Sequence, residues 1–298
     1  MDKPYISHEE SMKRITLSKP IFSLLLLFMA FAGKAAVVDT VRIYSKVMKK
    51  EIPCVVIRPD SYSASHRNGF RVSSKIYPVV YLLHGYGGDF GNWIKKVPSL
   101  IKEVDDLQMI IVCPDGAFSS WYFDSPVDSS MKYETFVADE VPAYIDTHYH
   151  TIKNKHGRAI AGLSMGGHGA LFISIRHPKF FGACGSMSGV VDLFASHDKF
   201  DIIKRIGDTS NNNSYWHDYS AINVVEKYEL KDSISFIIDC GIKDFTLIPN
   251  RKLHEKMLQL NISHDYIERP GDHNWDYWSN SIQYQLLFFR RYFDRYYK

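Results

Sequence analysis

A serine between two glycines is the residue of this chain with the clearest potential for nucleophilic chemistry. Residues 162–167 read Gly-Leu-Ser-Met-Gly-Gly, which places Ser164 at the centre of a Gly-x-Ser-x-Gly pattern. This pattern is typical of a sharp turn from a strand into a helix, which lifts the serine hydroxyl clear of the backbone. A hydroxyl is a weak nucleophile unless a neighbouring base accepts its proton. The chain must therefore also supply a base and a site for negative charge.

His273 is the predicted base among the thirteen histidines of the chain. Where a serine turn of this kind supports catalysis, the acid and the histidine follow later strands, in the order serine, acid, histidine. His273 comes directly after the last predicted strand, 265–269, on a turn that contains proline and glycine. His264 precedes that strand and is expected at the opposite edge of the sheet. His84 and His168 come too early in this order, so we interpret both as structural.

Asp244 is the predicted acid, because it lies just past the carboxyl end of the predicted strand 234–240. A carboxylate there would hold the imidazole in the required tautomer and stabilise the imidazolium that forms during proton transfer. An ordinary turn aspartate is the alternative interpretation. Asp239 is the second candidate, but it falls inside the strand and would point into a face of the sheet.

Two backbone N–H groups are predicted to receive negative charge on a substrate oxygen. One belongs to Met165, at the start of the helix that follows the serine turn. The other belongs to Tyr86, in the glycine-rich loop 84–89 (His-Gly-Tyr-Gly-Gly-Asp) after the first predicted parallel strand. This loop lacks the spacing of a phosphate-binding loop. It is therefore interpreted as the second half of an oxyanion hole.

Strands and helices alternate along most of the chain, which predicts an α/β fold with a mostly parallel central sheet, helices on both faces and antiparallel N-terminal strands. Functional groups are then expected on loops at the carboxyl ends of the strands. Pro142 predicts a kink within its helix. The predicted strands are 38–43, 52–58, 77–83, 109–113, 157–161, 182–188, 234–240 and 265–269; the predicted helices are 93–107, 133–149, 168–175, 249–260 and 278–296.

The segment 190–230 interrupts this alternation with polar residues and no clear periodicity. We expect it to form a cap over the site, with a solvated loop as the alternative. The rest of 36–298 reads as a single domain with a substantial core. The chain carries 36 basic and 33 acidic residues with no basic stripe, so nucleic acid is not an expected partner. The oligomeric state is left open.

The N-terminal residues 1–35 resemble a secretory signal peptide. An apolar run over 21–33, too short for a membrane span, follows Lys13, Arg14 and Lys19 and precedes small residues at 32–36. Translation starting at Met12 would give a cleaner basic region, because the first eleven residues include two glutamates. The mature protein is expected to be periplasmic or secreted, without a membrane span.

The four cysteines, Cys54, Cys113, Cys184 and Cys240, lie in apolar strand-like runs. An even number of cysteines in an exported protein invites a disulfide interpretation. Their apolar surroundings favour buried free thiols instead. No cysteine or histidine spacing predicts a metal site.

Four motifs in the same order resemble the esterase D family of the α/β-hydrolase fold: 82–88 (Leu-Leu-His-Gly-Tyr-Gly-Gly), 162–167, 240–244 (Cys-Gly-Ile-Lys-Asp) and 271–275 (Gly-Asp-His-Asn-Trp). The resemblance extends over nearly all of 40–298. It implies a triad of Ser164, Asp244 and His273, with oxyanion donors at Tyr86 and Met165 and no cofactor. The stretch 120–126 also resembles a family segment near the acyl pocket, which places Trp121 and Tyr122 as candidate substrate contacts.

The family includes S-formylglutathione hydrolases, feruloyl and acetyl xylan esterases, tributyrin esterases and antigen 85 mycolyltransferases. The export signal disfavours the first branch, whose members are usually cytoplasmic. Exported members often remove acyl or feruloyl groups from cell-wall polysaccharides. The tryptophans of the chain would suit a sugar or phenolic ring: Trp93, Trp121, Trp216, Trp275 and Trp278. Packing in the core is the alternative for these rings.

The resemblance thus implies an exported serine carboxylesterase acting on small-molecule or carbohydrate esters. The alternatives are acyl transfer to a sugar hydroxyl, a thioesterase like the S-formylglutathione hydrolases, and a non-catalytic binding module. The complete set of predicted catalytic residues counts against the last of these.

Overall fold

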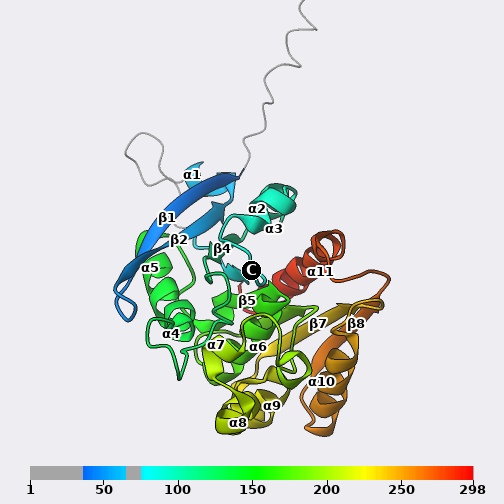
Figure 1. Ribbon diagram of the computed structural model, residues 1–298. Helices are drawn as coiled ribbons and strands as arrows, with labels where there is room; N and C mark the ends of the chain where they lie inside the picture. Colours follow the sequence, from blue (N-terminus) through cyan, green and yellow to red (C-terminus); the bar gives the residue numbers. More distant parts are fainter. Residues whose placement is uncertain (1–35, 65–74, 298) are drawn as a thin grey trace, which may run out of the picture. The chain divides into compact units, whose positions relative to one another are not determined.

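The computed structural model describes residues 36–64 and 75–297. The predicted signal peptide over 1–35 and the predicted start at Met12 lie outside the described residues. Within them, one eight-stranded sheet has the order β1-β2-β4-β3-β5-β6-β7-β8 (Figure 1). The strands are β1 Val37–Ser45, β2 Lys50–Arg58, β3 Val79–Leu83, β4 Ile110–Pro114, β5 Arg158–Leu163, β6 Ala183–Met187, β7 Ser235–Gly241 and β8 His264–Arg269.

The sheet is parallel from β4 to β8, while β1 and β2 are antiparallel to each other and β2 is antiparallel to β4. Every residue of β3, β4, β5 and β6 is buried. Strands that are covered on both faces read as continuous apolar runs. The predicted α/β fold with antiparallel N-terminal strands is therefore confirmed.

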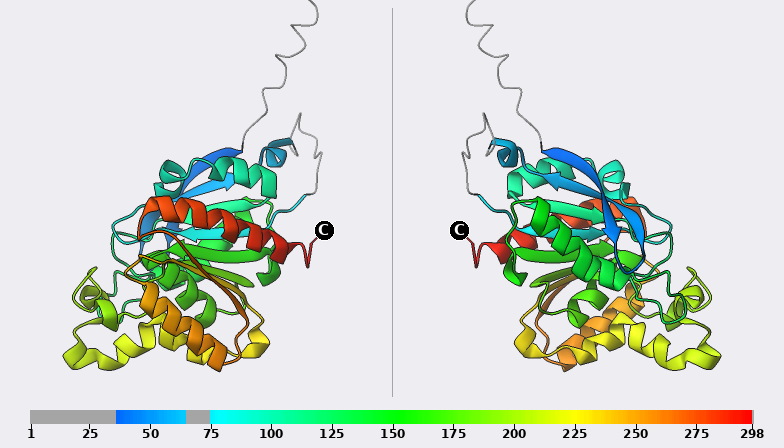
Figure 2. Two further views of the ribbon diagram at one scale, coloured as in Figure 1. Left: turned by 90° about the vertical axis from the view of Figure 1, so that its right-hand side faces the viewer. Right: turned by 90° about the vertical axis from the view of Figure 1, so that its left-hand side faces the viewer.

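Helices cover both faces of the sheet, and alternate residues of β3 show the two layers. Val79 and Tyr81 belong to the core beneath α5, α6, α9 and α10, whereas Val80 belongs to the core beneath α3 and α11 (Figure 2).

No helix within 36–64 or 75–297 combines the length and the apolar character needed to cross a bilayer. The principal helices are α1 Asp60–Ala64, α2 Asn92–Lys96, α3 Leu100–Leu107, α4 Tyr133–Thr135, α5 Val141–His148, α6 Met165–Arg176, α7 Ile203–Ile206, α8 Thr209–Tyr219, α9 Ala221–Val224, α10 Leu247–Gln259 and α11 Trp275–Phe293.

Two predicted helices are interrupted near prolines. The prediction of one helix over 93–107 was wrong, because α2 ends at Lys96 and α3 begins at Leu100, with Pro98 between them. Proline has no N–H to continue a helix and its ring collides with the preceding turn. The predicted helix 133–149 contains a π-helical turn over Phe136–Glu140, and Pro142 lies in the first turn of α5. The wider π turn accommodates the proline at that point.

The segment 190–230 is helical and packed rather than a solvated loop. It contains α7, α8 and α9, and the side chains of Ile202, Ile206 and Trp216 are fully buried. The Trp216 indole donates to the carbonyl of Gly207 at 2.9 Å. The expected role of this segment as a cap over the site stays a prediction.

The four cysteines are buried free thiols, as the apolar runs around them predict. Burial raises the pKa of the Cys184 thiol to about 12, and a hydrogen bond from Ser174 opposes this shift only in part. The thiols therefore stay protonated at neutral pH and pack as small apolar side chains.

Gly166 allows α6 to approach β3 closely. A Cβ at this position would lie 2.6 Å from the carbonyl oxygens of both Leu83 and His84, which are backbone atoms that cannot give way. We expect Gly166→Ala to lower the free energy of unfolding by about 1–3 kcal/mol, the usual cost of overpacking a core. Urea denaturation followed by circular dichroism measures this.

Gly91→Ala is the matched control for that substitution. Its φ is −91°, and an added Cβ would meet only side-chain atoms, the flexible end of Lys95 at 3.0 Å and the Oδ1 of Asp89 at 3.2 Å. This variant should unfold within about 0.5 kcal/mol of wild type. Equal stability losses in the two variants would contradict the close approach of α6 to β3.

Candidate active site

Ser164 occupies a strained turn between β5 and α6. Its φ is 54° and its ψ is −115°, a combination that a residue with a side chain rarely adopts. The turn is held by neighbours: a Cβ on Gly162 would lie 2.5 Å from the Gly166 backbone, and the Ser164 N–H donates to the carbonyl of Met187 in β6 at 2.9 Å. Surroundings that fix a residue so firmly can maintain an unfavourable backbone conformation.

Ser164, His273 and Asp244 form one hydrogen-bonded row, although they come from three separate loops. The His273 Nε2 lies 2.9 Å from the Ser164 Oγ, and the Nδ1 lies 2.9 and 3.0 Å from the two carboxylate oxygens of Asp244. A carboxylate only accepts hydrogen bonds, so the Nδ1 carries the proton and the Nε2 is left free to accept from the serine hydroxyl. This is the arrangement that a general base next to a nucleophile requires.

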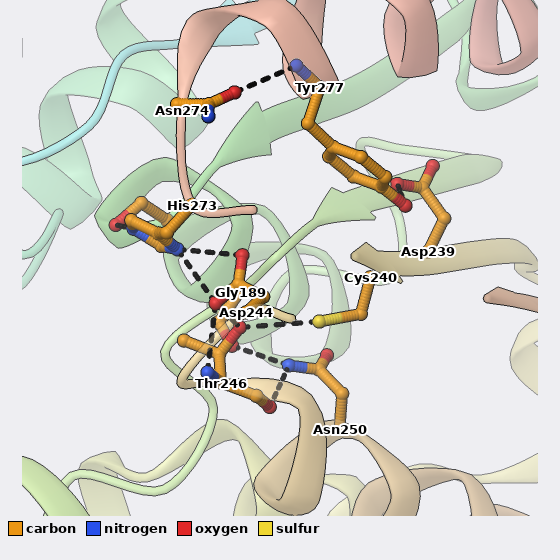
Figure 3. A network of polar contacts seen from close by, with 10 residues as sticks. Gly189, Asp239, Cys240, Asp244, Thr246, Asn250, His273, Asn274 and Tyr277 are labelled. Carbon is orange, nitrogen blue, oxygen red and sulfur yellow. Dashed lines mark hydrogen bonds and ion pairs between the residues drawn. The ribbon is translucent and has the colours of Figure 1, made fainter. Parts of the chain in front are cut away.

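Asp244 is fully buried at its side chain and well supplied with donors (Figure 3). The backbone N–H and the hydroxyl of Thr246 each donate to its Oδ1 at 2.8 Å. Burial raises the pKa of the Asp244 carboxyl, but the hydrogen bonds from His273 and Thr246 outweigh it and bring the pKa below its usual value. Asp244 is therefore ionised at neutral pH.

The loop that carries Asp244 is held in place by hydrogen bonds from Asn250 of α10. Its amide nitrogen donates to the carbonyl of Thr246 at 2.9 Å and to the carbonyl of Gly189 at 2.8 Å (Figure 3). One fully buried side chain thus joins the loop after β7 to the loop after β6. Sequence reasoning did not single out Asn250, because a polar residue inside a helix gives no sign of its distant partners.

The loop 84–89 reaches the nucleophile through Gly85. A Cβ added to Gly85 would lie 3.5 Å from the Cβ of Ser164, and Gly85, Tyr86 and Ser164 line the same pocket. Met165 is the first residue of α6, whose initial N–H groups have no partner within the helix. Both backbone groups predicted as oxyanion donors therefore lie on segments next to Ser164. Their role in stabilising charge stays a prediction.

His84 braces this loop. Its Nδ1 lies 2.8 Å from the carbonyl of Gly85, and its Nε2 accepts from the N–H of Gly116 at 2.8 Å. This pair of contacts requires a neutral ring with its proton on Nδ1. Burial lowers the pKa of His84, which agrees with a neutral ring. The interpretation of His84 as structural fits this geometry.

A pocket of about 170 Å³ opens beside the serine. Among the four side chains that sequence reasoning proposed as substrate contacts, Trp275 alone lines it. Trp93 is fully buried behind Trp275, with the two rings 5.2 Å apart, and donates to the carbonyl of Leu83 at 3.1 Å. Trp278 also lines the pocket. Sequence reasoning missed three other lining residues: Leu163, which precedes Ser164, and Asn92 and Phe200, which approach from distant segments.

Trp121 and Tyr122 are fully buried and do not line this pocket. Instead they hold its walls. The Tyr122 hydroxyl donates to the carbonyl of His84 at 3.0 Å, and the Trp121 indole donates to the carbonyl of Phe200 at 2.9 Å. Both residues have positive φ, 58° and 59°, and both side chains belong to the same buried core. They support the pocket from behind.

A larger cavity of about 740 Å³ lies elsewhere, lined by residues that include Ile76, Gln108, Arg290 and Tyr296. None of its lining residues belongs to the row of Ser164, His273 and Asp244. The chemistry of the row, rather than cavity size, therefore identifies the candidate site.

The fold and this site together define a serine hydrolase of the α/β type. Residues 45–289 match the model of a family described as putative esterases. The chain belongs to this esterase family, which confirms the resemblance noted in its motifs.

Three similar proteins match most of the chain. An acetyl esterase from Caldicellulosiruptor saccharolyticus is 26% identical over 81% of this chain and 94% of its own length. The solved structure of a ferulic acid esterase is 29% identical, covers 87% of this chain and 100% of its own, and has a TM-score of 0.73. An S-formylglutathione hydrolase from Staphylococcus aureus has a TM-score of 0.75 at 18% identity, covers 86% of this chain and 100% of its own, and supports the fold.

Replacing Asp244 tests the row directly. We expect Asp244→Asn to lower kcat by about 10⁴-fold, because an amide allows the wrong imidazole tautomer. The exposed neighbour Asp272, one residue from His273, gives the control Asp272→Asn, which should retain activity within about twofold. Hydrolysis of p-nitrophenyl acetate measures both. Equal activity in the two variants would remove Asp244 from the row.

The lowered pKa of Asp244 also predicts a pH-dependent contribution to stability. In an unfolded chain the pKa of an Asp side chain is about 3.9. As the pH falls, the unfolded chain therefore binds this proton before the folded chain does. The folded state therefore loses stability as the pH falls through the lower, folded pKa. The stability of wild type relative to Asp244→Asn should shrink between about pH 6 and about pH 3 in urea titrations. A widening difference would contradict the lowered pKa.

Proposed function

We propose that this protein hydrolyses carboxylic esters through an acyl-enzyme on Ser164. The Ser164 Oγ attacks the ester carbonyl while its proton passes to the His273 Nε2. The tetrahedral oxyanion accepts hydrogen bonds from the N–H groups of Met165 and Tyr86. The bond to the alcohol then breaks, and His273 returns the proton to the leaving oxygen.

Water completes the cycle in the same geometry. His273 takes a proton from water, whose oxygen attacks the acyl carbon, and Ser164 leaves with the proton from His273. Asp244 stabilises the imidazolium in both steps. The observation that carries the proposal is the unbroken row of hydrogen bonds from Ser164 through His273 to the ionised Asp244.

We further propose acetyl or feruloyl esters of carbohydrates as the substrates. The pocket of about 170 Å³ is lined by aromatic rings, among them Phe200, Trp275 and Trp278, beside the polar side chain of Asn92. Aromatic rings with few polar groups suit a small acyl group or a phenolic ring. The similarity to an acetyl esterase and to a ferulic acid esterase supports the same choice.

Ser164→Ala tests the mechanism on p-nitrophenyl acetate and butyrate, methyl ferulate and acetylated xylan. We expect kcat to fall by about 10⁴-fold or more on every ester that wild type cleaves, since the nucleophile is removed. The control is Ser174→Ala, which removes a buried serine hydroxyl from α6, the helix that follows Ser164. Its activity should stay near that of wild type. Unchanged hydrolysis by Ser164→Ala would overturn the proposal, and the ester cleaved most efficiently would identify the acyl group.

Acyl transfer to a sugar hydroxyl is a second candidate, because one match is to a mycolyltransferase, Ag85A of Mycobacterium tuberculosis. That match has 34% identity over 124 residues and covers 39% of this chain and 36% of that enzyme. Adding xylose or trehalose to the ester assay distinguishes the two reactions. Acylated sugar as the main product would favour transfer, while free acid at unchanged rate would favour hydrolysis.

We propose in addition that the protein is exported through a signal peptide over residues 1–35. The support is the apolar run over 21–33 between basic and small residues. N-terminal sequencing of the mature protein from its native host should give a first residue between 32 and 37. A mature chain that begins upstream of residue 30 would overturn this proposal.

A further inference from the structure

Asp239 is a fully buried carboxylate that the proposed reaction does not use. It lies in β7, five residues before Asp244. Three side chains of α11 converge on it: Ser281 Oγ lies 2.5 and 2.6 Å from the two carboxylate oxygens, the Gln285 amide donates at 3.0 Å and the Tyr277 hydroxyl donates at 3.1 Å. A buried carboxylate with this many donors is held in place firmly.

A positive charge from the neighbouring strand completes the cluster. The Arg269 guanidinium, at the end of β8, lies 3.4 Å from the Asp239 carboxylate. The rings of Tyr284 and Tyr277 lie 4.2 and 5.7 Å from the same guanidinium. Burial raises the pKa of Asp239, and the Ser281 hydroxyl and Arg269 oppose that shift. The cluster therefore joins β7, β8 and α11 through one side chain.

These three elements flank the two loops that carry Asp244 and His273. Asp244 follows β7, and His273 lies between β8 and α11. The two loops are themselves bonded backbone to backbone: the N–H of Ile242 donates to the carbonyl of Arg269 at 2.9 Å, and the N–H of Lys243 donates to the carbonyl of Gly271 at 3.0 Å. A shift of one loop must move the other.

Tyr277 connects the cluster to the His273 loop by direct contact. Gly271 has φ +150°, and a Cβ on it would lie 2.4 Å from the Tyr277 ring, so the loop rests on this ring. Asn274, next to His273, accepts from the backbone N–H of Tyr277 at 3.0 Å (Figure 3). The position of the Tyr277 ring thus determines where the His273 loop lies, and the Tyr277 hydroxyl is held by Asp239.

We propose that Asp239 and Tyr277 are positioning residues that keep His273 within hydrogen-bonding distance of Asp244 and Ser164. They act through the loops and touch neither the substrate nor the reacting atoms. Catalytic geometry is demanding, since a misplacement of about 1 Å can cost about 100-fold in rate. Losing the hydroxyl of Tyr277 should leave the loop on its ring but free the ring to shift. The inference rests on the proposed esterase function of the same site.

Tyr277→Phe and Tyr284→Phe form a matched pair on α11 for the test. Both lose one hydroxyl and keep the ring, but Tyr284 is about half exposed, at 49%, and its ring contact to Arg269 is preserved. A fluorophosphonate probe labels an activated serine, so its final stoichiometry counts competent sites and its rate reports how well Ser164 is activated. The kinetics of p-nitrophenyl acetate, expressed per labelled site, give kcat and KM.

We expect Tyr277→Phe to lower both kcat and the phosphonylation rate by about tenfold per labelled site, with KM within about twofold of wild type. Tyr284→Phe should match wild type in all three. Asp239→Asn should lower the same two rates at least as much. Unchanged rates per labelled site in Tyr277→Phe would overturn the inference, whether or not stability changes. If the melting temperature falls while the rates stay the same, the role of Tyr277 is merely structural.

A second pair decides the matter if Tyr277→Phe does not fold. Ser281→Ala removes a donor to Asp239, while Ser279→Ala removes a hydroxyl that bonds only locally, to the carbonyl of Asp276. Lowered rates per site in Ser281→Ala alone support the inference, and equal rates in the two variants overturn it. Failure of the esterase proposal has a different signature, because Ser164→Ala would then be labelled and active like wild type.

Discussion

The spacing between the carboxyl ends of three parallel strands is the constraint on which this site depends. Ser164 follows β5, Asp244 follows β7 and His273 follows β8, so no two of them share a loop. β6 lies between β5 and β7, and hydrogen bonds at its end reach both sides. The N–H of Ser164 donates to the carbonyl of Met187, and the N–H of Ser188 donates to the carbonyl of Asp239 at 2.8 Å. The hydrogen bonds between Ser164, His273 and Asp244 tolerate shifts of only a few tenths of an ångström, so their geometry depends on the register of the strands in the sheet. The helices on both faces keep that sheet rigid.

Two buried carboxylates, five residues apart on β7 and its following loop, illustrate how environment separates their roles. Asp244 meets an imidazole that changes its charge during the proposed reaction, whereas Asp239 meets donors that keep their protons and an arginine that keeps its charge. Both need several donors, because a buried charge without partners is costly. Only the first lies next to a group able to pass a proton to substrate.

The residues of the proposed triad could be identified from the sequence because each leaves a local sign. Gly162 and Gly166 reveal the strained turn at Ser164, and chain order separates His273 from twelve other histidines. The pocket walls leave no such sign. Phe200 lines the pocket from the distant segment 190–230, and Trp121 belongs to a similar stretch in the family yet points into the core. Side-chain direction there depends on two consecutive positive φ angles, which no periodicity announces.

The wall of the pocket that carries Phe200 is attached in part through main-chain carbonyl groups. Trp121 binds the carbonyl of Phe200, Ser125 binds the carbonyl of Arg205, and Arg205 itself reaches the carbonyl of Ser119. Carbonyl groups are the same in every residue, so these three hydrogen bonds do not depend on the side chain at position 200, although the Phe200 ring also packs against Tyr86 and Phe245. A substitution at position 200 would keep these three hydrogen bonds and would lose the ring contacts. The surface that the pocket presents beside Ser164 therefore depends on the residue at position 200, whereas the hydrogen bonds that attach this segment do not.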